Sequence, residues 1–306
     1  MTLTLLGHIV LPEHKAKGGF DHAAVHAASG HVYVAHTAND AVDVFDPASR
    51  QYLFSVPGLP GVAGALVNDE SGLIFSSNRA ANTIGVFAPG PNPTVRIIDV
   101  GRGPNGLAYD PGRRIVLAAN VGDPAMPDSH TLSMVELAHE VRRTEIAVPG
   151  RTRWAVFDPG CELFYVNIAQ PAEIVVVDPR RPDRIARRFA VPHAGPHGLD
   201  FDGATGRLFC ACDSGVLVTL DAQSGEVLDE KPLGGVPDVV FFNRQRQHLY
   251  VAIGDPGVID VFSTRPMEKL ATIETEPGAH TTALAPAGDR LYAFLPRTHR
   301  AAVYET

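Results

Sequence analysis

Hydrophobic and polar positions along the chain repeat one phrase: a small-residue turn, an apolar run ending in Asp or Asn, a glycine-rich turn, and an alternating strand. The phrase is clearest in residues 103–120, GPNGLAYDPGRRIVLAAN, and in residues 195–213, GPHGLDFDGATGRLFCACD. Related segments begin at residues 20, 61, 152, 236 and 278. Short runs rich in Val, Ile and Phe and bounded by Gly, Pro, Asn or Asp are typical of β-strands. The chain therefore contains seven copies of a strand-rich unit.

Aligning the copies places one residue of each at the start of its first strand: Asp21, Ala63, Asn105, Arg153, His197, Asp238 and His280. We call these the ring residues. Their spacings are 42, 42, 48, 44, 41 and 42 residues. A period near 42 with four strand-like segments per copy is typical of propeller blades. We predict an all-β, seven-bladed β-propeller of four-stranded antiparallel blades, with residues 1–306 forming a single domain.

The two ends of the chain fit a closed ring. The last copy supplies only three strands, and the strand-like residues 2–11 have no local partner. We predict that residues 2–11 add the fourth strand to the last blade, because this pairing removes two exposed sheet edges.

Composition restricts the class of protein further. The chain is 45% hydrophobic and 20% charged, as expected of a folded domain. A net charge of −8 disfavours binding to nucleic acid. Three cysteines indicate a reducing compartment, and Cys210 and Cys212 are expected to be buried and inert. No basic leader and no apolar run of ~18 residues is present, so we expect a cytoplasmic protein that does not contact membranes.

Candidate chemistry gathers at one end of the predicted channel. First strands line the channel of a propeller, so the ring residues should surround one channel mouth. His197, Asp238, His280 and Asp21 come from adjacent blades of the closed ring. Two imidazoles and two carboxylates predict a divalent metal site for zinc, manganese or calcium. The alternative, that they bind only water and neighbouring backbone, stays open.

Three further residues receive roles at this mouth. Arg153 is predicted to hold a substrate carboxylate or a developing oxyanion, with an ion pair to Asp238 or to the end of a second strand as the structural alternative. Asn105 joins Arg153 as a substrate-binding residue. His22, next to Asp21, is a candidate proton acceptor, with a carboxylate of the ring residues as the alternative. His22 and Arg153 are the predicted catalytic residues.

Other polar positions are given structural roles. Asn78, Asn120, Asn167 and Asp213 end the second strands, where Asn and Asp cap turns. His36 ends the second strand of the first blade and is a weaker candidate for a supporting residue behind the site at the channel mouth. The long loop of residues 121–131, with His130, is expected near the mouth. Trp154 is expected to pack between blades, and His31, His139 and His248 to face solvent.

The chain also resembles known propellers. Residues 33–46 (YVAHTANDAVDVFD), 75–88 (FSSNRAANTIGVFA) and 165–178 (YVNIAQPAEIVVVD) look like the repeats of YVTN-repeat, YncE-like seven-bladed propellers. The resemblance implies the fold for essentially the whole chain. Because that family includes both binding proteins and lactonase-like enzymes, it does not choose between these functions.

A weaker resemblance concerns the mouth. PNGLAYD at residues 104–110 and PDVVFFN at residues 237–243 are similar to strand starts of gluconolactonase, or regucalcin-like, propellers. This likeness implies that Asp21, Asn105 and Asp238 hold a divalent cation. Those propellers usually have six blades, and His197 and His280 have no clear counterpart there.

Two functions follow from these patterns. The first is a metal-dependent, lactonase-like hydrolase acting on a small molecule at the channel mouth, where the metal would polarise a carbonyl or activate water. The alternative is a non-catalytic propeller that binds a ligand or partner on the same face. A copper-dependent oxidase would need a denser histidine cluster or a Met ligand. The pattern specifies neither the substrate nor the oligomeric state.

Overall fold

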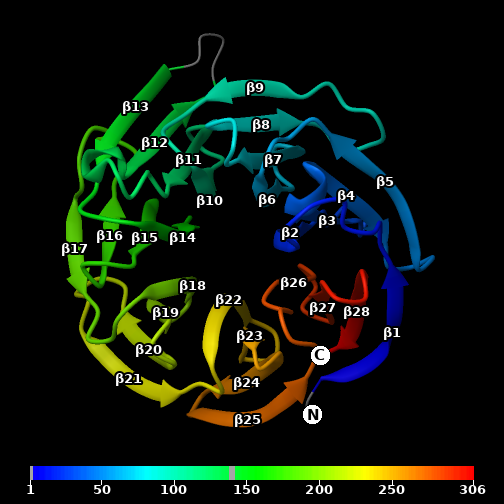
Figure 1. The fold of residues 1–306 in the computed structure, drawn as a ribbon. Helices are drawn as coiled ribbons and strands as arrows, with labels where there is room; N and C mark the ends of the chain where they lie inside the picture. Colours follow the sequence, from blue (N-terminus) through cyan, green and yellow to red (C-terminus); the bar gives the residue numbers. More distant parts are fainter. Residues whose placement is uncertain (1–2, 138–141) are drawn as a thin grey trace.

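A computed structural model describes residues 3–137 and 142–306. These residues form twenty-eight β-strands in seven four-stranded sheets, with two short 3-10 turns, η1 (Thr37–Asn39) and η2 (Pro127–Ser129). Figure 1 shows the sheets standing side by side around a central axis. The predicted all-β, seven-bladed propeller is therefore confirmed.

Each blade begins at the axis. The innermost strands are β2 (Phe20–Val25), β6 (Val62–Asn68), β10 (Pro104–Asp110), β14 (Thr152–Asp158), β18 (Pro196–Asp202), β22 (Val236–Asn243) and β26 (Thr282–Leu284). The second strands are β3 (Val32–His36), β7 (Leu73–Asn78), β11 (Ile115–Asn120), β15 (Leu163–Ile168), β19 (Arg207–Cys212), β23 (His248–Asp255) and β27 (Arg290–Leu295). All inner pairs are antiparallel, as in Pro196 opposite Cys212.

The outer half of each blade adds two strands. The third strands are β4 (Ala41–Asp46), β8 (Thr83–Phe87), β12 (Thr131–Glu136), β16 (Glu173–Val177), β20 (Val216–Asp221), β24 (Val258–Thr264) and β28 (Arg300–Glu305). The outermost strands are β5 (Gln51–Pro57), β9 (Arg96–Asp99), β13 (Arg142–Ala147), β17 (Arg187–Ala190), β21 (Val227–Pro232), β25 (Met267–Glu274) and β1 (Thr4–Val10).

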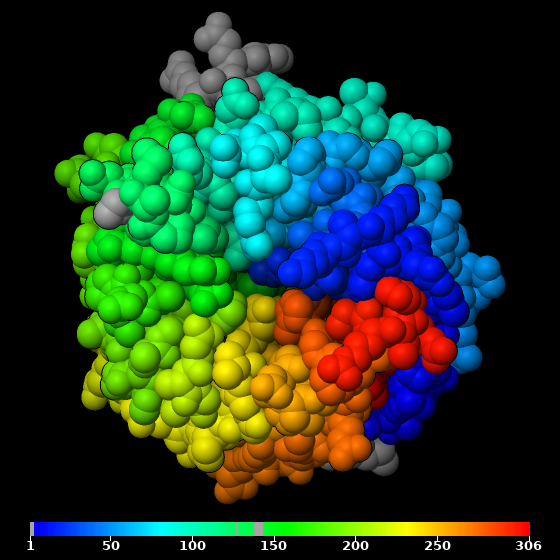
Figure 2. Space-filling view, in the orientation of Figure 1, coloured from blue at the N-terminus to red at the C-terminus, as the bar shows by residue number. Residues whose placement is uncertain are grey.

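The N-terminal strand closes the ring, as predicted. β1 is the outermost strand of the last sheet and pairs antiparallel with β28, from Thr4 opposite Glu305 to Val10 opposite Arg300. Figure 2 shows the two ends of the chain lying against each other. Ile9, which is 1% exposed, joins Phe20 and Phe294 in one apolar cluster, so the strand is held by packing as well as by backbone hydrogen bonds.

Blades are held together by apolar layers between neighbouring sheets. Side chains of a strand alternate between its two faces. In β3, Val32 and Val34 pack toward the last blade, whereas Tyr33 and Ala35 pack toward the second. Such alternation buries both faces of the second and third strands, which explains why their sequences are apolar almost throughout.

A histidine cluster lies beside the closure. His36 is fully buried; its Nδ1 lies 2.6 Å from Asp43 Oδ2 and its Nε2 lies 2.7 Å from His14 Nδ1. The His14 and His299 rings stack edge to face, 4.4 Å apart. Burial and the neighbouring His36 and His299 lower the pKa of His14. His36 therefore links the first blade, through His14, to His299 of the last blade. It does not belong to the polar residues at the channel mouth.

Glycines one position after three ring residues allow the inner strands to approach closely. A Cβ on Gly106 would lie 2.5 Å from the carbonyl oxygen of Arg153, and one on Gly64 would lie 2.7 Å from that of Asn105. A Cβ on Gly198 would overlap the carbonyl oxygen of Asp238 even more closely. The absence of side chains here lets the innermost strands of neighbouring blades lie close together, and at Gly198 it brings His197 and Asp238 into contact. In Figure 2 only a narrow opening remains at the centre.

Across residues 3–137 and 142–306, no helix is both long and apolar enough to cross a membrane.

Candidate functional site at the channel mouth

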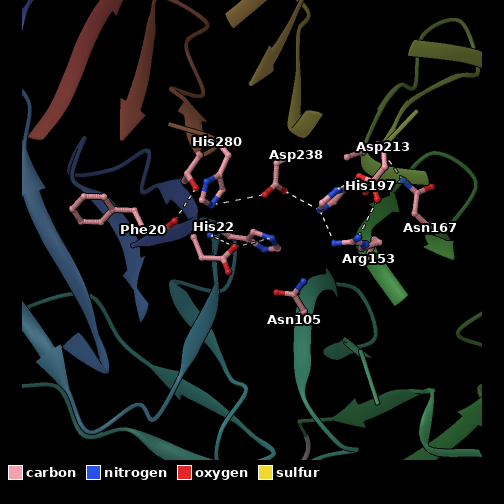
Figure 3. A network of polar contacts seen from close by, with 12 residues as sticks. Phe20, His22, Asn105, Arg153, Asn167, His197, Asp213, Asp238 and His280 are labelled. Atoms are coloured by element: carbon pink, nitrogen blue, oxygen red, sulfur yellow. Dashed lines mark hydrogen bonds and ion pairs between the residues drawn. The ribbon is translucent and has the colours of Figure 1, made fainter. Parts of the chain in front are cut away.

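The ring residues lie on one face, as the repeat predicts. Five of them are the second residue of an innermost strand, Asp238 is the third residue of β22, and His280 precedes β26 by two residues. Figure 3 shows His197, Asp238, His280 and Arg153 turned toward a common space, with Asn105 across from them. The structure therefore brings polar side chains from separate blades together at the channel mouth.

His197 is the centre of this network. Its Nδ1 lies 2.7 Å from Asp213 Oδ1, and its Nε2 lies 3.1 Å from Arg153 Nη1 and 3.2 Å from Asp238 Oδ1. Asp238 in turn lies 3.9 Å from His280 Nε2. When His197 is neutral, it donates from Nδ1 to Asp213 and presents the Nε2 lone pair to Arg153. The imidazole is thus held in one orientation by a carboxylate.

Asp213 has a role that the repeat pattern did not predict. It accepts a 3.1 Å hydrogen bond from Arg153 Nη2 in addition to the contact with His197. Burial alone would raise its pKa, but the His197 hydrogen bond and the charges of Arg153 and Arg151 lower the pKa below the ordinary value. Arg153 therefore pairs with Asp213, one of the second-strand ends that the structural alternative named, and not with Asp238.

Two of the other second-strand ends behave as predicted. Asn78 Nδ2 donates to the Thr83 hydroxyl, and Asn120 Nδ2 donates to the hydroxyls of Thr131 and Ser133, across the loops that they cap. Asn167 differs, because its Nδ2 reaches the neighbouring blade and donates to the carbonyl oxygens of His197 and Gly198. All three amides have structural partners, so of this set Asp213 joins the polar network.

Asp21 and Asn105 are joined by an arginine that sequence reasoning missed. Arg79 Nη2 donates to Asn105 Oδ1 at 2.6 Å and lies 3.4 Å from Asp21 Oδ2. A side-chain cation thus stands between two of the residues that the gluconolactonase resemblance assigns to a metal. Its position directly after Asn78, the end of a second strand on this face, is the signal that would have identified it.

His22 faces the channel but is not free. It is 6% exposed, its ring packs on that of Trp154 at 4.0 Å, and its Nε2 lies 3.4 Å from Asp21 Oδ1. Burial lowers the pKa of His22, and the nearby Asp21 and Asp238 only partly offset this effect. Since His22 belongs to the first blade and Trp154 to the fourth, the two rings meet across the channel. Trp154 packs against the apolar cluster between the fourth and fifth blades, as expected, and in addition meets His22 across the channel.

The predicted metal set is only partly assembled. Asp238 lies between His197 and His280, while Asp21 lies with Arg79 and His22. Among the residues that the structure describes, no three His, Cys, Asp or Glu side chains are grouped so that they could hold a metal ion. In this arrangement the residues pair with each other and do not form a ligand shell, so the metal site stays a prediction.

The remaining candidates lie apart from the network. His130 Nδ1 donates to the carbonyl oxygen of Val121 at 2.5 Å, within its own loop. Cys210 and Cys212 are free, fully buried and part of the same apolar cluster, as predicted. His31 and His248 are partly exposed, and His139 lies outside the described residues.

Arginines dominate one side of the mouth. Arg151, two residues before Arg153, is exposed and has no ion-pair partner among the residues that the structure describes. Partial burial and the neighbouring charges of Arg153 and Arg79 lower the pKa of Arg151. Arg153 and Arg79 pair with Asp213 and Asp21, but their positive charges still act on Arg151, although the whole chain is acidic.

Comparison with known proteins identifies the fold. No protein-family profile and no curated protein matches the chain. Among solved structures, a chain of Kuenenia stuttgartiensis hydrazine synthase is 12% identical, with a TM-score of 0.83 over 96% of this chain and 97% of that one. A chain of a mitotic checkpoint complex is 10% identical, with a TM-score of 0.83 over 100% of this chain and 92% of that one. At these identities the likeness shows the β-propeller fold alone.

Proposed function

We propose that this propeller binds a small, hydroxylated anionic molecule at the channel mouth. The observation that carries the proposal is the group of three arginines, of which Arg151 has no ion-pair partner among the described residues. A guanidinium offers several N–H donors in a planar fork that suits a carboxylate. An anion placed between these groups would relieve their mutual repulsion.

The rest of the mouth supports a ligand with hydroxyl groups. Asp238 and Asn105 present oxygen acceptors, and His197 and His280 present ring nitrogens, on the same face as the arginines. A mixture of donors and acceptors around a charged anchor favours a polyhydroxylated acid over an apolar one.

Calorimetric titration tests this proposal. Gluconate, citrate and phosphate serve as anionic probes, and sorbitol serves as the neutral polyol matched to gluconate. We expect gluconate to bind at least about tenfold more tightly than sorbitol, and Arg151→Ala and Arg153→Ala each to weaken gluconate binding by about tenfold or more. This range corresponds to the loss of one charge-assisted hydrogen bond.

Arg184→Ala is the matched control. Arg184 is exposed and lies between the third and fourth strands of its blade, on the face opposite the mouth. This variant should bind gluconate like the wild type. Binding of none of the three anions, or unchanged affinity in the Arg151 and Arg153 variants, would refute the proposal.

Hydrolysis of a lactone is a second proposal, favoured by the His197–Asp213 pair. An imidazole oriented by a carboxylate is the usual form of a general base, and a lactone opens to a hydroxy acid of the kind the arginines would hold. The YVTN and gluconolactonase resemblances agree with this chemistry, and a cytoplasmic location would suit it.

Glucono-δ-lactone, followed by acid release, tests the second proposal. The rate is measured without metal and after reconstitution with zinc, manganese or calcium, while bound metal per chain is determined in parallel. His197→Ala should remove any acceleration. A wild-type rate equal to the spontaneous one under every condition would exclude lactone hydrolysis and leave anion binding as a separate question.

A further inference from the structure

A second chamber of the channel lies beyond the His22–Trp154 contact. It is a cavity of about 360 Å³ bordered by the innermost strands of all seven blades, a size that suits a small organic molecule. Its walls are largely apolar and include the aromatic rings of Trp154, Phe157, Phe201 and Phe241. This chamber differs in chemistry from the polar mouth.

The repeat pattern makes one wall residue exceptional. Three positions after the ring residue, six strands carry apolar side chains: Ala24, Leu66, Ala108, Val156, Phe241 and Ala283. The fifth blade carries Asp200 at this position. A carboxyl group therefore replaces the apolar residue that the repeat otherwise places there.

Asp200 has no cation to balance it. Its oxygens accept backbone hydrogen bonds from Phe201 at 2.8 Å and from Phe242 at 2.6 Å, and no ion pair to it is found among the described residues. Within residues 3–137 and 142–306, no Lys or Arg lines the cavity, whereas Asp69 adds a second carboxylate at its border. Each Asp200 oxygen keeps a further acceptor site. Burial raises the pKa of Asp200 to about 7.

We propose that this chamber binds a small apolar ammonium ion, such as an arylalkylamine, with its charged nitrogen on Asp200. The apolar part would lie against Trp154 and Phe241, whose rings meet edge to face at 6.4 Å. Aromatic faces attract cations, and apolar walls favour the hydrocarbon portion. The site uses none of the mouth arginines, so it is independent of the function proposed for them.

The competing explanation is that Asp200 serves only the backbone. Its two hydrogen bonds satisfy N–H groups of adjacent inner strands, which would be sufficient for a structural residue. Asp200→Asn separates the two explanations, because the amide keeps the size and one acceptor but removes the negative charge. A purely structural carboxyl would give no preference for cations.

Trp154 is the only tryptophan of the chain and lies in the cavity wall, so its fluorescence reports occupancy. The probes are 2-phenylethylammonium, the neutral 2-phenylethanol and the anionic 3-phenylpropionate. We expect saturable changes with the ammonium ion at least about tenfold tighter than with the alcohol, and weakest binding of the anion. Equal affinity for ammonium and alcohol in the wild type would overturn the proposal.

The Asp200→Asn variant should lose the preference for the ammonium ion while still binding the alcohol, and the Arg153→Ala variant should keep that preference.

The pH dependence of binding to the wild type supplies a second measurement. As the pH increases toward 7, affinity for the ammonium ion should rise about tenfold per pH unit, because Asp200 loses its proton. Above pH 7 the affinity should level off, because Asp200 and the alkylammonium are both charged there. The other titratable or charged groups facing this site are His22, Asp69, Tyr109 and, further off, Arg244. An unchanged preference in Asp200→Asn, or a flat wild-type profile, would overturn the proposal.

Discussion

Deletion of residues 1–11 should lower the melting temperature by about 10 °C or more, because it removes the strand that closes the ring. The deletion takes away Ile9 and Leu11, which are 1% and 3% exposed, and leaves the edge of β28 unpaired. Truncating a buried aliphatic side chain costs about 2–5 kcal/mol, a large part of the ~5–15 kcal/mol that stabilises a typical protein. Calorimetric or circular dichroism melting measures the effect.

Two controls show whether closure is the cause. Leu5 and Val10 of the same strand are 49% and 71% exposed, so a Leu5→Thr, Val10→Thr variant should melt within about 2 °C of the wild type. A synthetic peptide of residues 1–12 added to the truncated protein should restore part of the loss by adding the strand back. A truncated protein that melts with the wild type would show that β1 contributes no closure.

Gly198→Ala should destabilise the protein by about 3 kcal/mol and disorganise the channel mouth. The new Cβ would overlap the Asp238 carbonyl oxygen and lie 2.9 Å from Val240 Cγ2. Because the closest of these atoms is backbone, the β18 and β22 strands must separate, and overpacking of this kind costs about 1–3 kcal/mol or more. Separation also moves Asp238 from His197, so any ligand held at the mouth should bind more weakly.

Gly112→Ala provides the comparison, because its Cβ would meet nothing closer than Asp110 Oδ1 at 3.4 Å. This variant should unfold within about 0.5 kcal/mol of the wild type. Denaturant unfolding of both variants gives the two free energies. If Gly198→Ala is as stable as Gly112→Ala, the close approach of the inner strands does not depend on this glycine.

The fold could be predicted because its information is local and repeated. Each copy carries the same turn residues and the same alternation, so seven weak signals reinforce one another. The closing strand followed from counting: the last copy lacked one strand, and residues 2–11 lacked a partner. The ring residues followed as well, since the starts of equivalent strands must lie on one face.

The contacts at the mouth could be predicted only in part. The sequence places His197, Asp238 and His280 in adjacent blades, and the structure finds them in a row. The position of Arg79 directly after Asn78 indicates the face on which it lies, but not that its side chain stands between Asp21 and Asn105. The repeat position that Asp213 shares with asparagines predicted a turn cap, and this expectation concealed its contact with His197.

Sequence by itself determined the number of blades, the closure and the level at which each residue stands along the channel. Only the tertiary structure decided which side chains meet across it. His22 reaches Trp154 from the opposite side of the ring, and Asp200 faces an apolar chamber. The physical reason is that the repeat fixes a residue's height and the face of its strand, whereas contacts across the channel depend on its width. That width is set by how closely all seven blades pack around the axis, partly through the glycines that let neighbouring backbones touch.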